Sequence, residues 1–236
     1  MECSSKNYKT IEDISLNEFF KIWIVDYAEK SLRKKNISRY KTLWPRIDKC
    51  LGHLMINDIK PNHLIQFYSM LKEDGVRLDG KPGGLSITTI KHHHTLISSM
   101  FEYALTWELA TFNPSSRVKL SKLGFSNRDS KRITEEMIYS IEQIKVLLKL
   151  IDAEDIKYRT LINLAIFTGC RREELMGLEW KDIDLNTGKI KIIRSSQYNI
   201  HDGVYEDGLK TYKSKRVCQV PNKVISLLKI YKNWWE

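Results

Sequence analysis

Apolar side chains recur every three or four positions through the first half of the chain, which is the period of an amphipathic helix. Between residues 12 and 114 this pattern predicts four helices with short connections, and hence a compact all-α domain. Ser15 and Glu18 have the spacing of a capping box at the start of the first helix. The predicted helices start at Ser15, run from Tyr40 to Gly52, follow Pro61, and run from about Ser86 to Leu109.

The second half begins with the same helical period and then changes to a period of two. Ser140 and Gln143 form another potential capping box, and LINLAIF at 161–167 continues the helical pattern. The alternation that follows predicts three antiparallel strands in one small sheet, at KIKIIR (189–194), near 197–205, and at KRVCQVP (215–221). A final amphipathic helix is expected after Pro221. The fold class is therefore mainly α with a small antiparallel β-sheet, and the second domain covers 135–236.

Residues 115–134 separate these two regions and show no sustained periodicity. They carry six Lys and Arg against one acid, which is typical of a basic linker. Such a segment lies along a phosphate backbone in one interpretation and is a merely solvated connector in the other. The sequence favours neither.

The positive charge is concentrated in the first half. The whole chain has 236 residues and a net charge of +10, and residues 1–134 hold 22 Lys and Arg against 14 Asp and Glu, whereas the remainder holds 17 against 15. This distribution predicts a polyanionic partner. Nucleic acid is favoured over a membrane surface because the sequence shows no long basic amphipathic helix, lipidation signal, transmembrane-length apolar run or leader. A soluble, cytoplasmic protein is expected.

The four cysteines, Cys3, Cys50, Cys170 and Cys218, lie far apart and show no CxxC spacing. This pattern predicts free thiols in a reducing cytoplasm and argues against a disulfide framework or a zinc ribbon.

The stretch TGCRREELMGLEWKDID, Thr168 to Asp184, places charge at the start of what should be a core helix. On a helical wheel, Arg171 and Glu174 share the face of the following leucines and are close enough to pair. We therefore expect a half-buried guanidinium. One interpretation is a structural ion pair; the other is an arginine that its glutamate holds so that its donors point at an anion.

This stretch closely resembles the first catalytic box of the tyrosine recombinases, the family of phage integrases: Thr-Gly-x-Arg, a Glu three residues on, then Leu-x-Trp-x-Asp-Ile-Asp. LKTYKSKRVCQVP (209–221) is similar to the family's lysine-bearing β-hairpin segment, with Lys210 at the matching position. FNP at 112–114 matches the usual end of the family's four-helix core-binding domain. The resemblance covers residues 12–236 and is strongest over 160–221.

The resemblance implies roles for three residues. Arg171 would bind the non-bridging oxygens of the scissile phosphate, and Glu174 would orient Arg171 from behind. Lys210 would be the general acid that protonates the departing 5′-oxygen. A tyrosine nucleophile would store the bond energy as a 3′-phosphotyrosyl link, so no metal, nucleotide or other cofactor is expected.

The sequence departs from the family after Pro221. The family's second box, with His-x-x-Arg and the nucleophilic tyrosine, should follow the next helix, and the sequence ends at Glu236 before it. We therefore expect a fragment that binds DNA without cutting it, from a parent that acts as a tetramer on paired core-type sites of double-stranded DNA. The tyrosines at positions 198, 205, 212 and 231 are interpreted as structural.

Side chains at three places are candidates for DNA contact, although a solvated face remains open for each of them. They are Ser38, Arg39 and Lys41 in the second helix, Thr88, Thr89, Lys91 and His92 at the start of the fourth, and Lys213 and Arg216 near the hairpin. The run KHHHT (91–95) also suggests a metal. Consecutive helical residues point about 100° apart and do not converge on one ion, so surface or DNA-facing histidines are favoured.

Two other hypotheses remain open at this stage. One is a DNA-binding accessory protein or decayed integrase of the same architecture without chemistry. The other is a helical protein-interaction domain in which the Arg171–Glu174 pair is only structural. Type IB topoisomerases use an arginine and a lysine in the same roles, but the four-helix first half favours an integrase.

Overall fold

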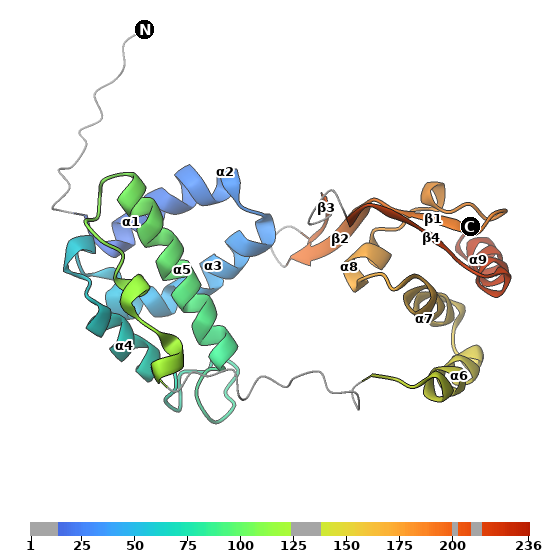
Figure 1. The fold of residues 1–236 in the computed structure, drawn as a ribbon, viewed down its shortest axis with the longest axis horizontal. Helices are drawn as coiled ribbons and strands as arrows, with labels where there is room; N and C mark the ends of the chain where they lie inside the picture. Colours follow the sequence, from blue (N-terminus) through green and yellow to red (C-terminus); the bar gives the residue numbers. More distant parts are fainter. Residues whose placement is uncertain (1–13, 124–137, 200–202, 209–213) are drawn as a thin grey trace, which may run out of the picture. The chain divides into compact units, whose positions relative to one another are not determined.

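A computed structural model describes residues 14–123, 138–199, 203–208 and 214–236 of the chain (Figure 1). The chain divides into two compact units, Met1–Lys131 and Arg132–Glu236. The prediction of a mainly α chain with short antiparallel strands in its second half is confirmed.

Among its described residues, the regular structure of unit 1 consists of helices and helical turns, with one isolated antiparallel bridge between Ser15 and Met55. Its first helix is capped as predicted, because the Ser15 hydroxyl accepts a hydrogen bond from the Glu18 amide while the Glu18 carboxylate accepts one from the Ser15 amide. The elements are α1 (Leu16–Trp23), a π-helical turn (Ile24–Ala28), α2 (Glu29–Ser31), α3 (Lys34–Ile47), a second π-helical turn (Asp48–Gly52), a 3₁₀ turn (Ile56–Asp58), α4 (Pro61–Met70), α5 (Ile87–Thr106) and two further 3₁₀ turns (Pro114–Arg117 and Leu120–Leu123).

The core of unit 1 combines aliphatic side chains from most of its helices with large aromatic side chains, several of them on α1 and α5. Phe19, Trp23 and Phe101 are completely or almost completely buried. Phe20 of α1 stacks face to face on Trp44 of α3, with ring centroids 3.8 Å apart. Burial of each large apolar side chain contributes about 1.5–3 kcal/mol, so this cluster fixes α3 and α5 relative to α1.

The three consecutive histidines of α5 do not all face solvent, which corrects the expectation for that run. His93 is completely buried against Phe67, and its Nδ1 lies 2.9 Å from the Thr89 carbonyl oxygen. His94 is half-buried and its Nδ1 is 3.1 Å from the Tyr68 hydroxyl. Three successive positions sweep some 200° of a helix, so at least one of them must turn toward the core.

The predicted linker, 115–134, begins too early. Ser115 and Val118 are buried in unit 1, where the Asn113 side chain accepts hydrogen bonds from the Ser115 amide and hydroxyl. Short 3₁₀ turns have no amphipathic period, so a search for periodicity misses a segment that packs in this way. The rest of the predicted linker, from residue 124 on, lies outside the described residues.

Among the described residues of unit 2, three α-helices precede the strands and one follows them. They are α6 (Ile141–Leu150), α7 (Ile156–Thr168) and α8 (Arg172–Met176), followed by a 3₁₀ turn (Trp180–Asp182), β1 (Lys189–Ile192), β2 (Arg194–Asn199), β3 (Gly203–Gly208), β4 (Arg216–Gln219) and α9 (Asn222–Trp235). The capping box predicted at Ser140 and Gln143 is present at the start of α6.

The strands form two antiparallel pairs rather than the single three-stranded sheet that the sequence predicted. β1 pairs with β4, with Ile190 opposite Cys218, and β2 pairs with β3, with Gln197 opposite Tyr205. The segment expected as one middle strand contributes to both β2 and β3. The alternation of apolar and polar residues shows which side chains point to which face of a sheet. It does not show where the chain turns back on itself.

A small apolar core holds the strand pair β1–β4 against α9. Ile190 and Ile192 of β1 and Val224 and Leu228 of α9 are almost completely buried, and Leu175 brings α8 into the same cluster. α8 also contacts β2 through Gly177, whose backbone lies directly against that of Ser195 and Ser196.

This contact generates a stability prediction. A Cβ atom at position 177 would lie 2.9 Å from the Ser195 Cα and from the Ser196 nitrogen, which are backbone atoms that cannot rotate away. We expect Gly177→Ala to destabilise the α8–β2 contact by about 1–3 kcal/mol. Hydrogen exchange of the α8 and β2 amides measures this loss. Gly208→Ala is the control, because a Cβ there meets nothing within 4 Å; equal protection in both variants would contradict the packing argument.

Candidate functional site

The chain turns sharply between α7 and α8, and Arg171 stands at that turn. α7 ends at Gly169, which adopts the left-handed conformation with φ 61° and donates its amide to the Ala165 carbonyl. The Thr168 hydroxyl accepts the Cys170 amide. Arg171 then precedes the first turn of α8 in an extended conformation. The wheel that placed Arg171 inside a continuous helix is therefore wrong, because α8 has only five residues and begins after it.

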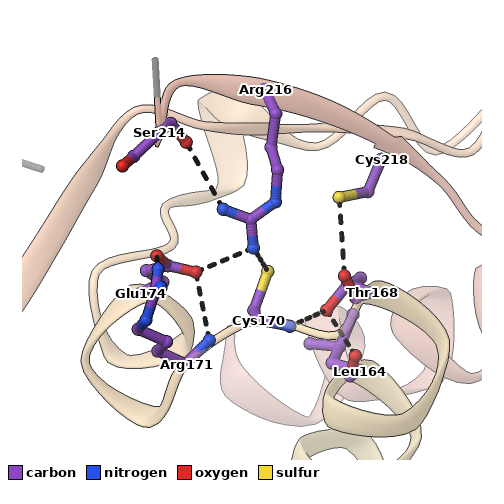
Figure 2. A network of polar contacts seen from close by, with 8 residues as sticks. All are labelled: Leu164, Thr168, Cys170, Arg171, Glu174, Ser214, Arg216 and Cys218. Carbon is purple, nitrogen blue, oxygen red and sulfur yellow. Dashed lines mark hydrogen bonds and ion pairs between the residues drawn. The ribbon is translucent and has the colours of Figure 1, made fainter. Parts of the chain in front are cut away.

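Glu174 is the buried centre of this site, with 3% of its surface exposed (Figure 2). One carboxylate oxygen, Oε2, accepts the Arg171 amide at 3.0 Å and Nη2 of Arg216 at 2.8 Å. The other, Oε1, accepts Nη1 of Arg171 at 2.9 Å. Burial raises the pKa of Glu174, but the hydrogen bonds from Arg216 and Arg171 outweigh it and lower that pKa to about 2. The carboxylate is therefore ionised at neutral pH.

Arg171 presents most of its guanidinium to solvent. Its side chain is 74% exposed, whereas the Glu174 side chain is 4% exposed. The half-buried guanidinium expected from the wheel is thus corrected: the acid is buried and the cation is open. Among the described residues, Glu174 is the acid that Arg171 contacts, so a guanidinium fixed at one edge keeps its remaining donors toward solvent.

Arg216 has a different partner from the one that the sequence suggested. It begins β4, and its side chain is 33% exposed. Nη2 donates to Glu174 and lies 3.3 Å from the Cys170 sulfur, while Nη1 donates to the Ser214 carbonyl at 3.3 Å (Figure 2). The hydrogen bond to Glu174 raises the pKa of Arg216. Its proposed partner was a DNA phosphate, and the structure places its guanidinium on the same carboxylate that holds Arg171.

A third arginine, Arg194, fixes the segment that follows α8. Its guanidinium pairs with the buried Asp182, lies 3.2 Å from Glu179, and is itself only 16% exposed. Asp184 closes the next turn by accepting the amides of Asn186 and Thr187. The acids of the Leu-x-Trp-x-Asp-Ile-Asp sequence therefore serve the local fold and hold β2 beside α8.

The other candidates of unit 2 are placed only in part. Lys210 and Lys213 lie outside the described residues, as does Tyr212. Tyr198 is exposed on β2 opposite Val204. Tyr231 packs between Trp180 and Trp234, which agrees with a structural role for that side chain.

The candidate DNA contacts of unit 1 come from two helices that touch each other, α3 and α5. Arg39, Lys41 and Thr88 are exposed, and Ser38, Thr89, Lys91 and His92 are half-buried. Burial, and to a smaller extent the charge of Arg39, lower the pKa of His92, so these side chains of α3 and α5 are near neighbours.

Several of these side chains interact within unit 1. Lys41 forms an ion pair with Glu29 at 2.8 Å. The Thr89 hydroxyl lies 2.9 Å from that of Ser86, the residue that caps α5. Arg39 is exposed, and its long side chain extends from the surface of α3.

Three further observations concern the described part of the chain. No helix there is both long enough and apolar enough to span a bilayer. Those residues contain no group of three or more His, Cys, Asp or Glu side chains positioned to hold a metal ion. Cys50, Cys170 and Cys218 are free thiols.

The chain is similar to known proteins of one family. Residues 138–235 match the phage integrase family. The chain is 26% identical over 235 residues to a tyrosine recombinase XerC-like protein of Caldanaerobacter subterraneus subsp. tengcongensis, which covers 94% of this chain and 56% of that protein. It is 28% identical over 150 residues to the ICEBs1 integrase of Bacillus subtilis, covering 63% of this chain and 38% of that one. The chain thus spans about half or less of these relatives.

Solved structures show the same fold. The Tn1549 transposon integrase in complex with a circular intermediate DNA superposes with a TM-score of 0.75 at 20% identity, over 94% of this chain and 66% of that one. A lambda integrase tetramer bound to a Holliday junction superposes with a TM-score of 0.55 at 14% identity, over 90% and 58%. Together with the family match, these likenesses confirm the resemblance to the tyrosine recombinases.

The buried carboxylate generates a pH prediction. The pKa of Glu174 is lowered in the folded chain, so its stabilisation is present above the unfolded pKa of about 4.5 and is lost as the pH falls toward 2. We expect the wild-type site to lose roughly 2 kcal/mol more than Glu174→Gln between pH 7 and pH 3. The variant should be the less stable one at pH 7, because it leaves Arg216 without its charged partner.

Urea unfolding of the whole chain, followed through NMR signals of α8 and β4 at both pH values, makes this measurement. Glu154→Gln, the same chemical change at an exposed position, is the control. Parallel acid curves for wild type and Glu174→Gln would show that the carboxylate is not held by its arginines.

Proposed function

We propose that this chain, which carries a phage integrase family domain at residues 138–235 and is related to the tyrosine recombinases, is part of a site-specific DNA recombinase. The parent enzyme cleaves and rejoins DNA strands through a 3′-phosphotyrosyl intermediate. The observation that supports this most directly is an exposed guanidinium, Arg171, fixed from behind by a buried and ionised carboxylate, Glu174.

The proposed chemistry uses this guanidinium as an electrostatic clamp. An attacked phosphodiester gains negative charge on its non-bridging oxygens, and a rigid cation with several aligned donors stabilises that charge without reorganising. Glu174 occupies one edge of Arg171 and leaves the other donors for the phosphate. Lys210 is the proposed general acid for the leaving 5′-oxygen. The energy of the broken phosphodiester bond is retained in a covalent link between the DNA strand and a protein tyrosine, so the reaction takes no metal, nucleotide or other cofactor.

The proposed partner is double-stranded DNA at a core-type recombination site. We assign the helical domain, residues 12–114, to duplex binding through the α3–α5 face that carries Arg39 and Lys91. Residues 115–134 connect it to the partial catalytic domain at 135–236. Recombination joins two duplexes, so the whole protein is proposed to act as a tetramer on paired sites, as the lambda integrase does on its Holliday junction.

This 236-residue chain by itself is proposed to bind duplex DNA without cleaving it. The support is the placement of two of the tyrosines described in unit 2: Tyr198 is on a hairpin surface and Tyr231 is packed among tryptophans. Neither is joined to Arg171 or Glu174 by a described contact. An accessory DNA-binding role is the second candidate, and the same observation favours it.

Duplex binding should weaken steeply with salt. Each phosphate that the protein neutralises contributes about 0.9 to the slope of log affinity against log salt concentration. We expect the double variant Arg39→Gln, Lys91→Gln to lower that slope by roughly 1 to 2 relative to wild type. Fluorescence anisotropy with a labelled duplex over a range of salt concentrations measures it. The double variant Lys145→Gln, Lys149→Gln at exposed positions of α6 is the charge-matched control. The absence of duplex affinity at low salt would refute DNA binding.

Cleavage should depend on Arg171 more than binding does. In the whole recombinase that contains this chain, Arg171→Ala should lower the yield of covalent protein–DNA adduct on a nicked site by at least about 100-fold, while site affinity changes only a few-fold. Denaturing gels detect the adduct, and the 236-residue chain alone should give none. Normal adduct formation by Arg171→Ala would overturn the role assigned to this side chain.

A further inference from the structure

We propose that Arg216 is a positioning residue for Arg171 and acts through Glu174 rather than by touching DNA. The inference rests on the proposed function, since it gives the phosphate-binding arginine its mechanical support. Arg216 and Glu174 are 42 residues apart in the chain, and their contact joins the start of β4 to the first turn of α8.

The donors of Arg216 are directed inward. Nη2 is directed at Glu174 Oε2 (2.8 Å) and Cys170 Sγ (3.3 Å), and Nη1 is directed at the Ser214 carbonyl (3.3 Å). Three contacts from one planar group fix its orientation. Figure 2 shows the guanidinium descending from β4 onto the carboxylate, between Cys170 and Ser214. A side chain held in this way has few donors left for a strand outside.

The two arginines therefore have different tasks at one carboxylate. A buried carboxylate needs a compensating charge, and an exposed partner compensates poorly because water screens it. Arg171 is 74% exposed and Arg216 is 33% exposed, so Arg216 supplies the better-shielded charge. It donates to Oε2, which also accepts the Arg171 amide, and leaves Oε1 to the Arg171 guanidinium. With Arg216 in place the carboxylate stays ionised, and its Oε1 remains an acceptor that holds the exposed guanidinium in one orientation.

Removal of Arg216 should release Arg171 without removing it. Glu174 would keep one exposed partner and the pull of burial, which raises its pKa. A protonated carboxyl presents one acceptor fewer to the Arg171 amide and guanidinium. Arg216→Lys keeps a positive charge and one donor toward Oε2. It should therefore keep the pKa of Glu174 low, whereas Arg216→Gln should raise that pKa.

The first experiment needs no DNA. NMR of the whole chain follows the Glu174 side-chain carboxyl carbon during an acid titration in wild type, Arg216→Gln, Arg216→Lys and Arg171→Ala. We expect the pKa of Glu174 to rise most in Arg216→Gln and to stay near the wild-type value in Arg216→Lys. The slowly exchanging guanidinium signals of Arg171 should collapse into an averaged one in Arg216→Gln. An unchanged titration and unchanged Arg171 signals in that variant would overturn the inference.

The second experiment separates positioning from direct contact. The salt slope of binding to a labelled random-sequence duplex is measured for Arg171→Ala, Arg216→Gln and the double variant. A positioning role predicts that each single variant lowers the slope by about 0.9, the value for one phosphate, and that the double variant lowers it no further. A loss of about 1.8 in the double variant would mean that Arg216 meets a second phosphate, and the inference would fail.

The two proposals can fail separately. If the wild-type chain shows no duplex affinity, DNA binding is refuted, and the acid titration still decides whether Arg216 controls Glu174. If binding and its salt slope are normal but the effects of Arg171→Ala and Arg216→Gln add, the recombinase assignment stands and the positioning role does not. Circular dichroism of each variant verifies that unit 2 remains folded, so a loss of binding through unfolding is recognised.

Discussion

The site depends on one buried carboxylate shared by two guanidinium groups. Glu174 is inside unit 2, Arg171 is outside, and Arg216 lies between these extremes. Burial of an unpaired carboxylate would cost several kcal/mol, and the hydrogen bonds from both arginines offset that cost. In return, the exposed guanidinium is fixed at one edge and open at the other. A side chain that binds a phosphate needs both a fixed orientation and unoccupied donors, and this arrangement combines the two.

The backbone around this carboxylate is arranged to make the contact possible. Gly169 ends α7 in a conformation that other residues adopt with difficulty, and this allows Arg171 to stand before α8 with its amide pointing at Glu174. On the other side, Gly177 lets β2 approach α8 more closely than any side chain would permit. The ion pair between Arg194 and Asp182 joins β2 to the 3₁₀ turn that follows α8. The ion pairs and the close backbone contacts therefore support each other.

Unit 1 uses a different means to present charge. Its aromatic core fixes α3 and α5 through stacked and edge-on rings, and the basic side chains extend from the surface of these helices. One of three consecutive histidines is part of that core, so a polar run in the sequence serves packing as well as surface chemistry. Attraction of a polyanion needs only a net positive surface, so a polar run can serve both purposes there. The phosphate binding that we propose for unit 2 needs a fixed geometry.

The sequence by itself determined what depends on near neighbours. The capping boxes at Ser15 and Ser140, the helical stripes, the mainly α class and the pairing of Arg171 with Glu174 all involve residues within four positions of each other, where local geometry is almost fixed. Only the tertiary structure decided that Arg216 is the second partner of Glu174, that His93 is buried and that the strands form two pairs. Those outcomes depend on how distant segments approach one another, and a pattern of periods specifies which face is apolar but not which other segment will cover it.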